Sequence, residues 1–196
     1  CSRVGGYFRG DRFTLRRCRV SDTSTEGIYL IAGSDCLLEK NVLTRNNVEK
    51  IVGYFPSAVK IFNQTHRVVC RDNLVIDQPE SNGIWYDVGN VDGVFIDNWI
   101  ENCTDGFFFE ISKNAIVAGN VFVDCEKGVR SLNSSGVRVY HNTFVNTGAA
   151  FERDVVAPAN AAFRRGDDAL GVTLMTGGIA GAAAAQGQAL QHRLRS

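Results

Sequence analysis

Short stretches of alternating apolar and polar residues recur along the chain, each following a small residue. Residues one and three places after the small residue are mostly apolar, and those two and four places after it are more mixed. The small residues are Gly27, Ala58, Gly83, Gly106 and Gly128. Because neighbouring side chains of a β-strand point to opposite faces, the pattern predicts short strands with one buried face.

A second marker is an asparagine followed two places later by an apolar residue. It occurs at Asn41, Asn73, Asn98, Asn120 and Asn142, at intervals of 32, 25, 22 and 22 residues. One coil earlier, Cys18 takes the asparagine place. A period near 22 built from short alternating segments with polar corners is typical of a β-solenoid. Like positions of successive coils would then stack at about 4.8 Å.

A second buried row is predicted five and three residues before each marker. The apolar pairs are Phe13/Leu15, Cys36/Leu38, Val68/Cys70, Ala115/Val117 and Val137/Val139. In the coil of Asn98 we expect a slip of one residue, with Val94 and Ile96 facing inward. The long interval between Asn41 and Asn73 predicts an inserted loop that includes Pro56.

These features resemble the right-handed parallel β-helix proteins of the pectate-lyase-like architecture, in which stacked asparagines hydrogen-bond along a turn. The resemblance covers residues 12–154. It implies an all-β fold, a right-handed single-stranded parallel β-helix (solenoid) of about six coils. We expect this domain to span residues 1–154, followed by an Ala/Gly-rich tail at 155–196 that is irregular or partly helical.

Charge and composition narrow the classes of function. The 196 residues include 21 basic and 21 acidic side chains, so no broad basic field favours a nucleic-acid partner. No apolar run of about 18 residues predicts a membrane span. The six cysteines form no CxxC pair or zinc spacing, so no structural metal is expected. The chain opens on Cys1 without a recognisable signal peptide; we expect a soluble protein, with secretion or a periplasmic location left open.

Acidic and aromatic residues fall in the outward columns two and four places after the glycines. Asp87 and Glu110, 23 residues apart, are expected to be stacked neighbours on one outer sheet. Trp85 and Phe108 would be displayed beside them. Aromatic side chains of this kind suit the C–H faces of sugar rings. The plainer interpretation is a pair of solvated surface acids.

Basic side chains are expected to border this group. Lys60 and Arg130 occupy the same columns in the flanking coils. One coil further on, Ala150 in the glycine place would set Glu152 and Asp154 in these columns.

Two carboxyl groups about one strand spacing apart favour glycoside hydrolysis. Retaining glycosidases hold their two carboxyl groups about 5–5.5 Å apart. A neighbouring negative charge also raises the pKa of one carboxyl group, as a general acid requires. The strings GIWYD and GFFFE, with AGN and YHNTF after them, resemble the β-helix glycoside hydrolases typified by a bacterial β-xylosidase family. The resemblance implies Asp87 as nucleophile and Glu110 as acid/base, acting on a plant-type or bacterial polysaccharide or oligosaccharide without a cofactor.

Two other functions stay open. In a polysaccharide lyase, Asp87 and Glu110 would hold Ca²⁺, with Lys60 or Arg130 near the proton to be removed. In a non-catalytic glycan-binding module, the aromatic residues alone would suffice. His141, just before Asn142, is a further candidate for substrate contact, although a hydrogen-bonded turn histidine is the plainer interpretation.

Cys103 and Cys125 are expected to stack as an inner thiol pair. Each lies five residues after a marker asparagine. A disulfide between the two coils stays open at this stage, although the Cβ spacing of stacked strands is somewhat long for the bond.

Overall fold

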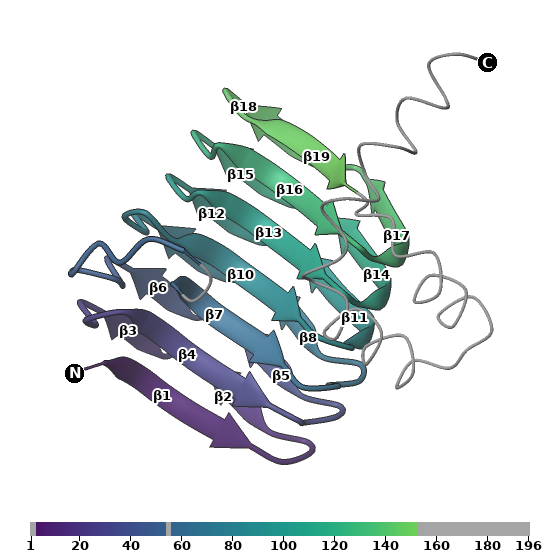
Figure 1. The fold of residues 1–196 in the computed structure, drawn as a ribbon, viewed down its shortest axis with the longest axis horizontal. Helices are drawn as coiled ribbons and strands as arrows, with labels where there is room; N and C mark the ends of the chain where they lie inside the picture. The colour runs from purple at the N-terminus through teal and green to yellow at the C-terminus, as the bar shows by residue number, and fades with distance from the viewer. Residues whose placement is uncertain (1–2, 54–55, 153–196) are drawn as a thin grey trace, which may run out of the picture.

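The computed structural model describes residues 3–53 and 56–152, which form a parallel β-solenoid with three sheets (Figure 1). No α-helix occurs among these residues. Each of the first six coils contributes one strand to each sheet in the same order, and β19 of the next coil adds a seventh strand to the first sheet. All strand pairs are parallel, as expected when successive coils stack.

The first sheet has seven strands. They are β1 (Val4–Arg9), β4 (Glu26–Ile31), β7 (Ser57–Phe62), β10 (Asn82–Asp87), β13 (Asp105–Glu110), β16 (Lys127–Leu132) and β19 (Gly148–Glu152). The second sheet has six. They are β2 (Thr14–Arg16), β5 (Leu37–Glu39), β8 (Val69–Arg71), β11 (Val91–Ile96), β14 (Lys113–Ala118) and β17 (Ser135–Tyr140). The third also has six. They are β3 (Arg19–Ser21), β6 (Val42–Thr44), β9 (Leu74–Ile76), β12 (Trp99–Glu101), β15 (Val121–Val123) and β18 (Thr143–Val145).

The rows one and three places after each glycine fill the interior of the solenoid, as predicted. Ile84 and Tyr86 of β10 are fully buried, and so are their partners Phe107 and Phe109 of β13. The row before each asparagine supplies the opposite wall of this core, with Val117 fully buried. The alternating apolar residues of the sequence therefore form the inner face of the coil.

The predicted slip in the coil of Asn98 is wrong. Phe95 pairs with Val117 and is fully buried, whereas Val94 and Ile96 lie on the outer side and are partly exposed. Gly93 takes the remaining inner place, where an added Cβ would lie 3.1 Å from the Tyr86 ring. The glycine thus makes room for an aromatic side chain from the facing sheet, and the register stays constant.

The marker asparagines form a buried ladder along one turn, as predicted. The backbone N–H and the side-chain amide of Asn73 both donate to Asn98 Oδ1 at 3.0 Å, and Asn98 repeats the arrangement toward Asn120. The Asn98 amide also donates to the Cys70 carbonyl oxygen. Cys18 occupies the same place and donates its N–H to Asn41 Oδ1. Each asparagine therefore satisfies backbone groups that the turn would otherwise leave unpaired.

The corners hold non-glycine residues at positive φ, and several pair along the solenoid axis. Arg45 (φ 51°) lies 2.7 Å from Asp22 (φ 57°). Arg67 lies 2.6 Å from Asp35 at another corner. These exposed ion pairs contribute little stability each, on the order of 0–1 kcal/mol. Asp and Asn are among the non-glycine residues that left-handed corners tolerate best.

Two predictions about the ends of the solenoid need correction. β1 adds a strand before residue 12, because Gly6 and Phe8 continue the inner row beside Ile28 and Leu30. In the last coil, Ala150 pairs with Arg130 and Glu152 with Leu132, two residues away from the predicted register. Asp154 and the predicted tail at 155–196 lie outside the described residues. The inserted loop lies between β6 and β7, as predicted.

Replacing Asn98 with alanine tests the ladder. We expect Asn98→Ala to lower the free energy of unfolding by about 2–4 kcal/mol, because it leaves buried donors of Asn73 and the Cys70 carbonyl unsatisfied. Chemical denaturation would measure the change. Asn102→Gly, at an exposed corner with φ 54°, is the control and should cost less than about 1 kcal/mol. Equal effects of the two substitutions would contradict the role of the ladder.

Candidate functional site

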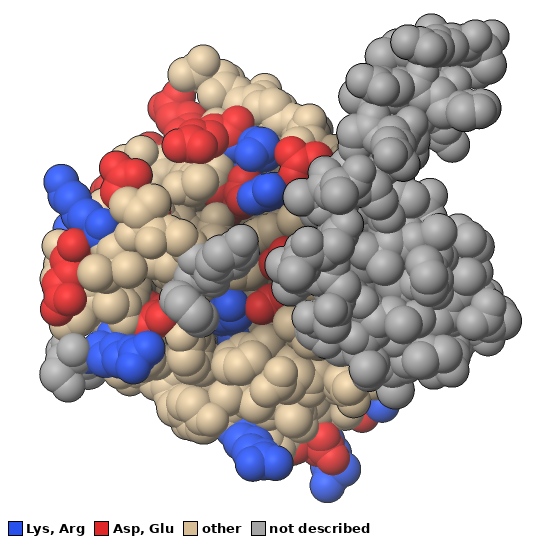
Figure 2. All heavy atoms as spheres, in the orientation of Figure 1, with Lys and Arg blue, Asp and Glu red and all other residues tan. Residues whose placement is uncertain are grey.

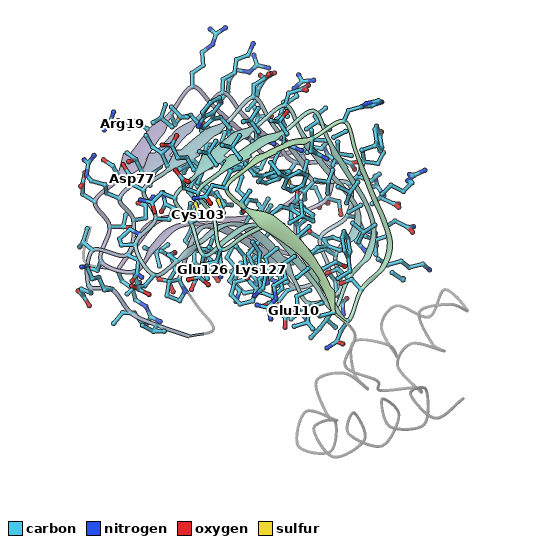
Figure 3. The ribbon with its side chains drawn as sticks, turned by 90° about the horizontal axis from the view of Figure 1, so that it is seen from above. Arg19, Asp77, Cys103, Glu110, Glu126 and Lys127 are labelled. Carbon is cyan, nitrogen blue, oxygen red and sulfur yellow. The ribbon has the colours of Figure 1, made fainter. Side chains whose placement is uncertain are left out.

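The predicted carboxyl pair lies on the outer face of the first sheet, where β10 and β13 end. Asp87 is directly paired with Glu110, and Trp85 with Phe108. Alternation along each strand turns these side chains outward, opposite to the buried Tyr86 and its neighbours. Figure 3, which views the stack of coils from above, shows Glu110 at the outer side of the stack. The predicted register of the site is confirmed.

Lys60 forms an ion pair with Asp87. Its Nζ lies 3.0 Å from Asp87 Oδ2, and the side chains are only 7% and 13% exposed. Lys60 comes from β7, one coil before Asp87, and pairs with Trp85 in register. Burial raises the pKa of the Asp87 carboxyl, and the Lys60 ammonium group opposes this rise. The cation therefore favours an ionised Asp87 in a poorly hydrated place.

Glu110 is in a different electrostatic environment. Burial, and then the negative charge of Asp87, raise the pKa of the Glu110 carboxyl to about 7. Lys60 and Arg130 oppose the rise but do not cancel it. A hydrogen bond between the two carboxyl groups further favours the proton on Glu110. The pair is therefore unequal near neutral pH, with Glu110 as the member that keeps its proton.

The aromatic residues are buried, so the prediction that they are displayed is wrong. Trp85 and Phe108 expose only 2% and 5% of their surfaces. Their rings stack at 4.9 Å with an interplanar angle of 17°. Lys60 Nζ lies 3.5 Å from the Trp85 ring centroid, and the Arg130 guanidinium 4.7 Å from that of Phe108. The coil spacing matches the ring-stacking distance, so the rings cover each other and the cations cover the two outer faces.

Arg130 is fixed by two carboxylates. It lies 3.1 Å from Asp105 Oδ2 and 2.9 Å from Glu152 Oε2. Asp105, at the start of β13, is 2% exposed, and burial raises the pKa of its carboxyl while Arg130 opposes the rise. Sequence reasoning missed Asp105 because it considered only the columns after the glycine. The available signal was an acid immediately before Gly106, matching Glu26 before Gly27.

One buried polar atom of Trp85 and one of Asp105 have no hydrogen-bond partner. They are Trp85 Nε1, a donor, and Asp105 Oδ1, an acceptor. The Lys127 ammonium group is 4.0 Å from the latter oxygen. Buried polar groups are usually satisfied, so the unpaired donor of Trp85 and the unpaired acceptor of Asp105 each carry a desolvation cost.

The structure does not bring His141 to this site. It lies at positive φ between β17 and β18, at the corner of the second and third sheets, and is exposed. Its ring makes an edge contact with Tyr140 at 5.4 Å. The carboxyl pair belongs to the first sheet instead. A substrate contact by His141 would therefore be separate from Asp87 and Glu110.

Acidic and basic side chains are interspersed on the face of the solenoid that Figure 2 shows. Within the part of the chain that the structure describes, no three His, Cys, Asp or Glu side chains converge as a metal site. A search of the same residues for helices long and apolar enough to cross a membrane found none.

Comparison with protein families matches residues 1–151 to the family described as "Right handed beta helix region". Searches of curated proteins and of solved structures gave no significant match.

The unequal titration of the pair can be measured directly. In ¹³C NMR, the Glu110 carboxyl should titrate near pH 7 in the native protein, and at lower pH in Asp87→Asn, because that substitution removes the neighbouring negative charge. Since the folded pKa lies above the usual value of 4.5, the contribution of Glu110 to stability is present below pH 4.5 and lost as the pH rises through about 7. Titration near 4.5 in both proteins would contradict the geometry.

Proposed function

We propose that this chain, which belongs to the right-handed β-helix family, is a retaining glycoside hydrolase with Asp87 as nucleophile and Glu110 as acid/base. The β-helix scaffold is shared by carbohydrate-active enzymes and by proteins with other functions, so the proposal rests on the site. The observation that carries it is the unequal, stacked carboxyl pair, one member paired to Lys60 and the other with a pKa of about 7.

The two carboxyl groups have the environments that the two roles require. Asp87 and Glu110 are directly paired on adjacent strands, whose spacing of about 4.8 Å is close to the separation of about 5–5.5 Å between the carboxyl groups of retaining enzymes. Asp87, kept ionised by Lys60, would attack the anomeric carbon while Glu110 gives its proton to the leaving oxygen. In the second step Glu110 would take a proton from water, which then releases the sugar from Asp87.

Substrate contacts with the aromatic residues would come from ring edges instead of open ring faces. Phe108 would contribute only its ring edge, because its faces contact Trp85 and Arg130. In this arrangement Lys60 and Arg130 position the acidic and aromatic side chains.

The two other functions receive less support from the contacts. A Ca²⁺ ion at the pair would have to displace Lys60 from Asp87, and a Glu110 that holds its proton near pH 7 is a poor ligand. A glycan-binding module that stacks sugars on Trp85 and Phe108 would need ring faces that are already covered. The carboxyl pair therefore supports hydrolysis best.

Substitution of each carboxyl group tests the proposal. With aryl glycosides and oligosaccharides, Asp87→Ala should lower turnover by about 10⁴-fold or more in protein that circular dichroism shows to be folded. Glu110→Ala should fail mainly on substrates with poor leaving groups, because these need protonation. Added azide should restore turnover of both variants. The glycosyl azides that the two variants form should have opposite anomeric configurations, which ¹H NMR distinguishes.

Asp92→Asn is the matched control for these variants. Asp92 is an exposed residue of β11 with φ 58°, a backbone conformation that asparagine tolerates. It should keep full activity. Unchanged turnover in the well-folded Asp87→Ala protein would refute the assignment of the nucleophile.

The Lys60 ion pair predicts a change in the pH profile. Lys60→Met removes a cation that lowers the pKa of both Asp87 and Glu110, so both limbs of the kcat/KM profile should move to higher pH. Lys113→Met, on β14 of the second sheet, serves as control. Circular dichroism would first establish that each variant is folded. A lower kcat/KM with unmoved limbs would assign Lys60 a purely structural role.

A further inference from the structure

Two free cysteines meet at the corner where the third sheet leads into the first. Cys103 and Cys125 each follow a strand of the third sheet by two residues, and the last residues of these strands, Glu101 and Val123, are paired. The cysteines thus hold equivalent places in successive coils, as the sequence predicted. Figure 3 labels Cys103 beside the sulfur atoms drawn in yellow.

The two thiols have the same orientation. Cys103 Sγ donates to the Glu101 carbonyl oxygen and Cys125 Sγ to that of Val123, both at 3.4 Å. When Cys125 is a thiolate, the neighbouring Cys103 S–H can donate to it instead, and this interaction lowers the pKa of Cys125. Burial is the main cause that raises the pKa of Cys103. One sulfur is therefore suited to react first as a thiolate, with the other beside it.

We propose that Cys103 and Cys125 are a redox modification site that forms a reversible disulfide between successive coils on reaction with a peroxide. The coil spacing of about 4.8 Å falls inside the Cα separation of about 4.4–6.8 Å that disulfides require. The side chains are 5% and 4% exposed, so the oxidant must be small, such as hydrogen peroxide. This inference does not depend on the proposed glycosidase activity.

The chemistry balances with one peroxide per disulfide. The Cys125 thiolate attacks one peroxide oxygen, the O–O bond breaks, and hydroxide leaves and takes up a proton to give water. Cys125 is then a sulfenic acid. Cys103 loses its proton and attacks this sulfur, the S–O bond breaks, and a second water leaves. Two thiols are oxidised by two electrons and one peroxide is reduced to two waters. An external dithiol reverses the reaction by exchange.

The other described cysteines lack such a partner. Cys70 is paired in register with Leu38, and the Cys18 N–H donates to Asn41. Cys36 Sγ donates to the Gly10 carbonyl oxygen. The proposed modification is therefore specific to one pair among the described residues.

The link would join the turns that lead into β13 and β16. Cys103 and Cys125 lie two residues before Asp105 and Lys127, the first residues of those strands. Closing a loop of this length restricts the unfolded chain, so oxidation should raise Tm by several degrees.

Peptide mapping tests the proposal directly. The full 196-residue chain with Cys1→Ser, so that this thiol cannot cross-link, would be treated with hydrogen peroxide. Free thiols would then be alkylated under denaturing conditions, and the protein digested without reduction. We expect one cross-linked peptide joining Cys103 to Cys125, its disappearance with dithiothreitol, and alkylated Cys18, Cys36 and Cys70.

The Tm of the same oxidised and reduced samples gives a second readout. The upward shift should be absent in Cys125→Ala, whose reduced form serves as its own reference. Alkylation of both Cys103 and Cys125 after peroxide treatment would overturn the proposal. So would a different disulfide pairing, or oxidation of Cys125 to a sulfinic acid without a cross-link.

Discussion

The constant register of stacked coils is the constraint on which the rest of the structure depends. A parallel sheet allows its strands to slide, and a slip of one residue would turn the inner face outward. The asparagine ladder opposes this slip because each side chain bonds backbone groups of the preceding coil and the side-chain oxygen of the next asparagine. The coil of Asn98 keeps the common register although Val94 and Ile96 would permit another. In this register Gly93 faces inward and leaves room for the Tyr86 ring.

A fixed register means that equivalent residues of successive coils must meet. On the outer face this brings Asp87 against Glu110 and stacks Trp85 on Phe108. Two acids at one strand spacing repel each other, and only a nearby cation or a retained proton relieves the repulsion. Here both contribute, with Lys60 paired to Asp87 and the pKa of the Glu110 carboxyl raised to about 7. The unequal carboxyl pair thus follows from the stacking of coils.

The sequence alone predicted the inner rows, the asparagine ladder and the pairing of Asp87 with Glu110, because all three depend on periodicity. It did not predict the burial of Trp85 and Phe108. Alternation predicts which face of the sheet a side chain points from, but it does not predict whether neighbouring side chains in the same column cover that side chain. Asp105 was missed for a related reason: its role comes from an ion pair with Arg130, 25 residues away, which a search of one column does not examine.

The most direct test of the account is the reaction of the native chain with defined oligosaccharides. Xylo-oligosaccharides and pectic oligosaccharides would be incubated with and without Ca²⁺, following new reducing ends and the ultraviolet absorbance of an unsaturated uronate. A hydrolytic carboxyl pair predicts reducing ends without that absorbance, independent of Ca²⁺. Ca²⁺-dependent absorbance would make Asp87 and Glu110 metal ligands, and the absence of both signals would contradict catalysis by this pair.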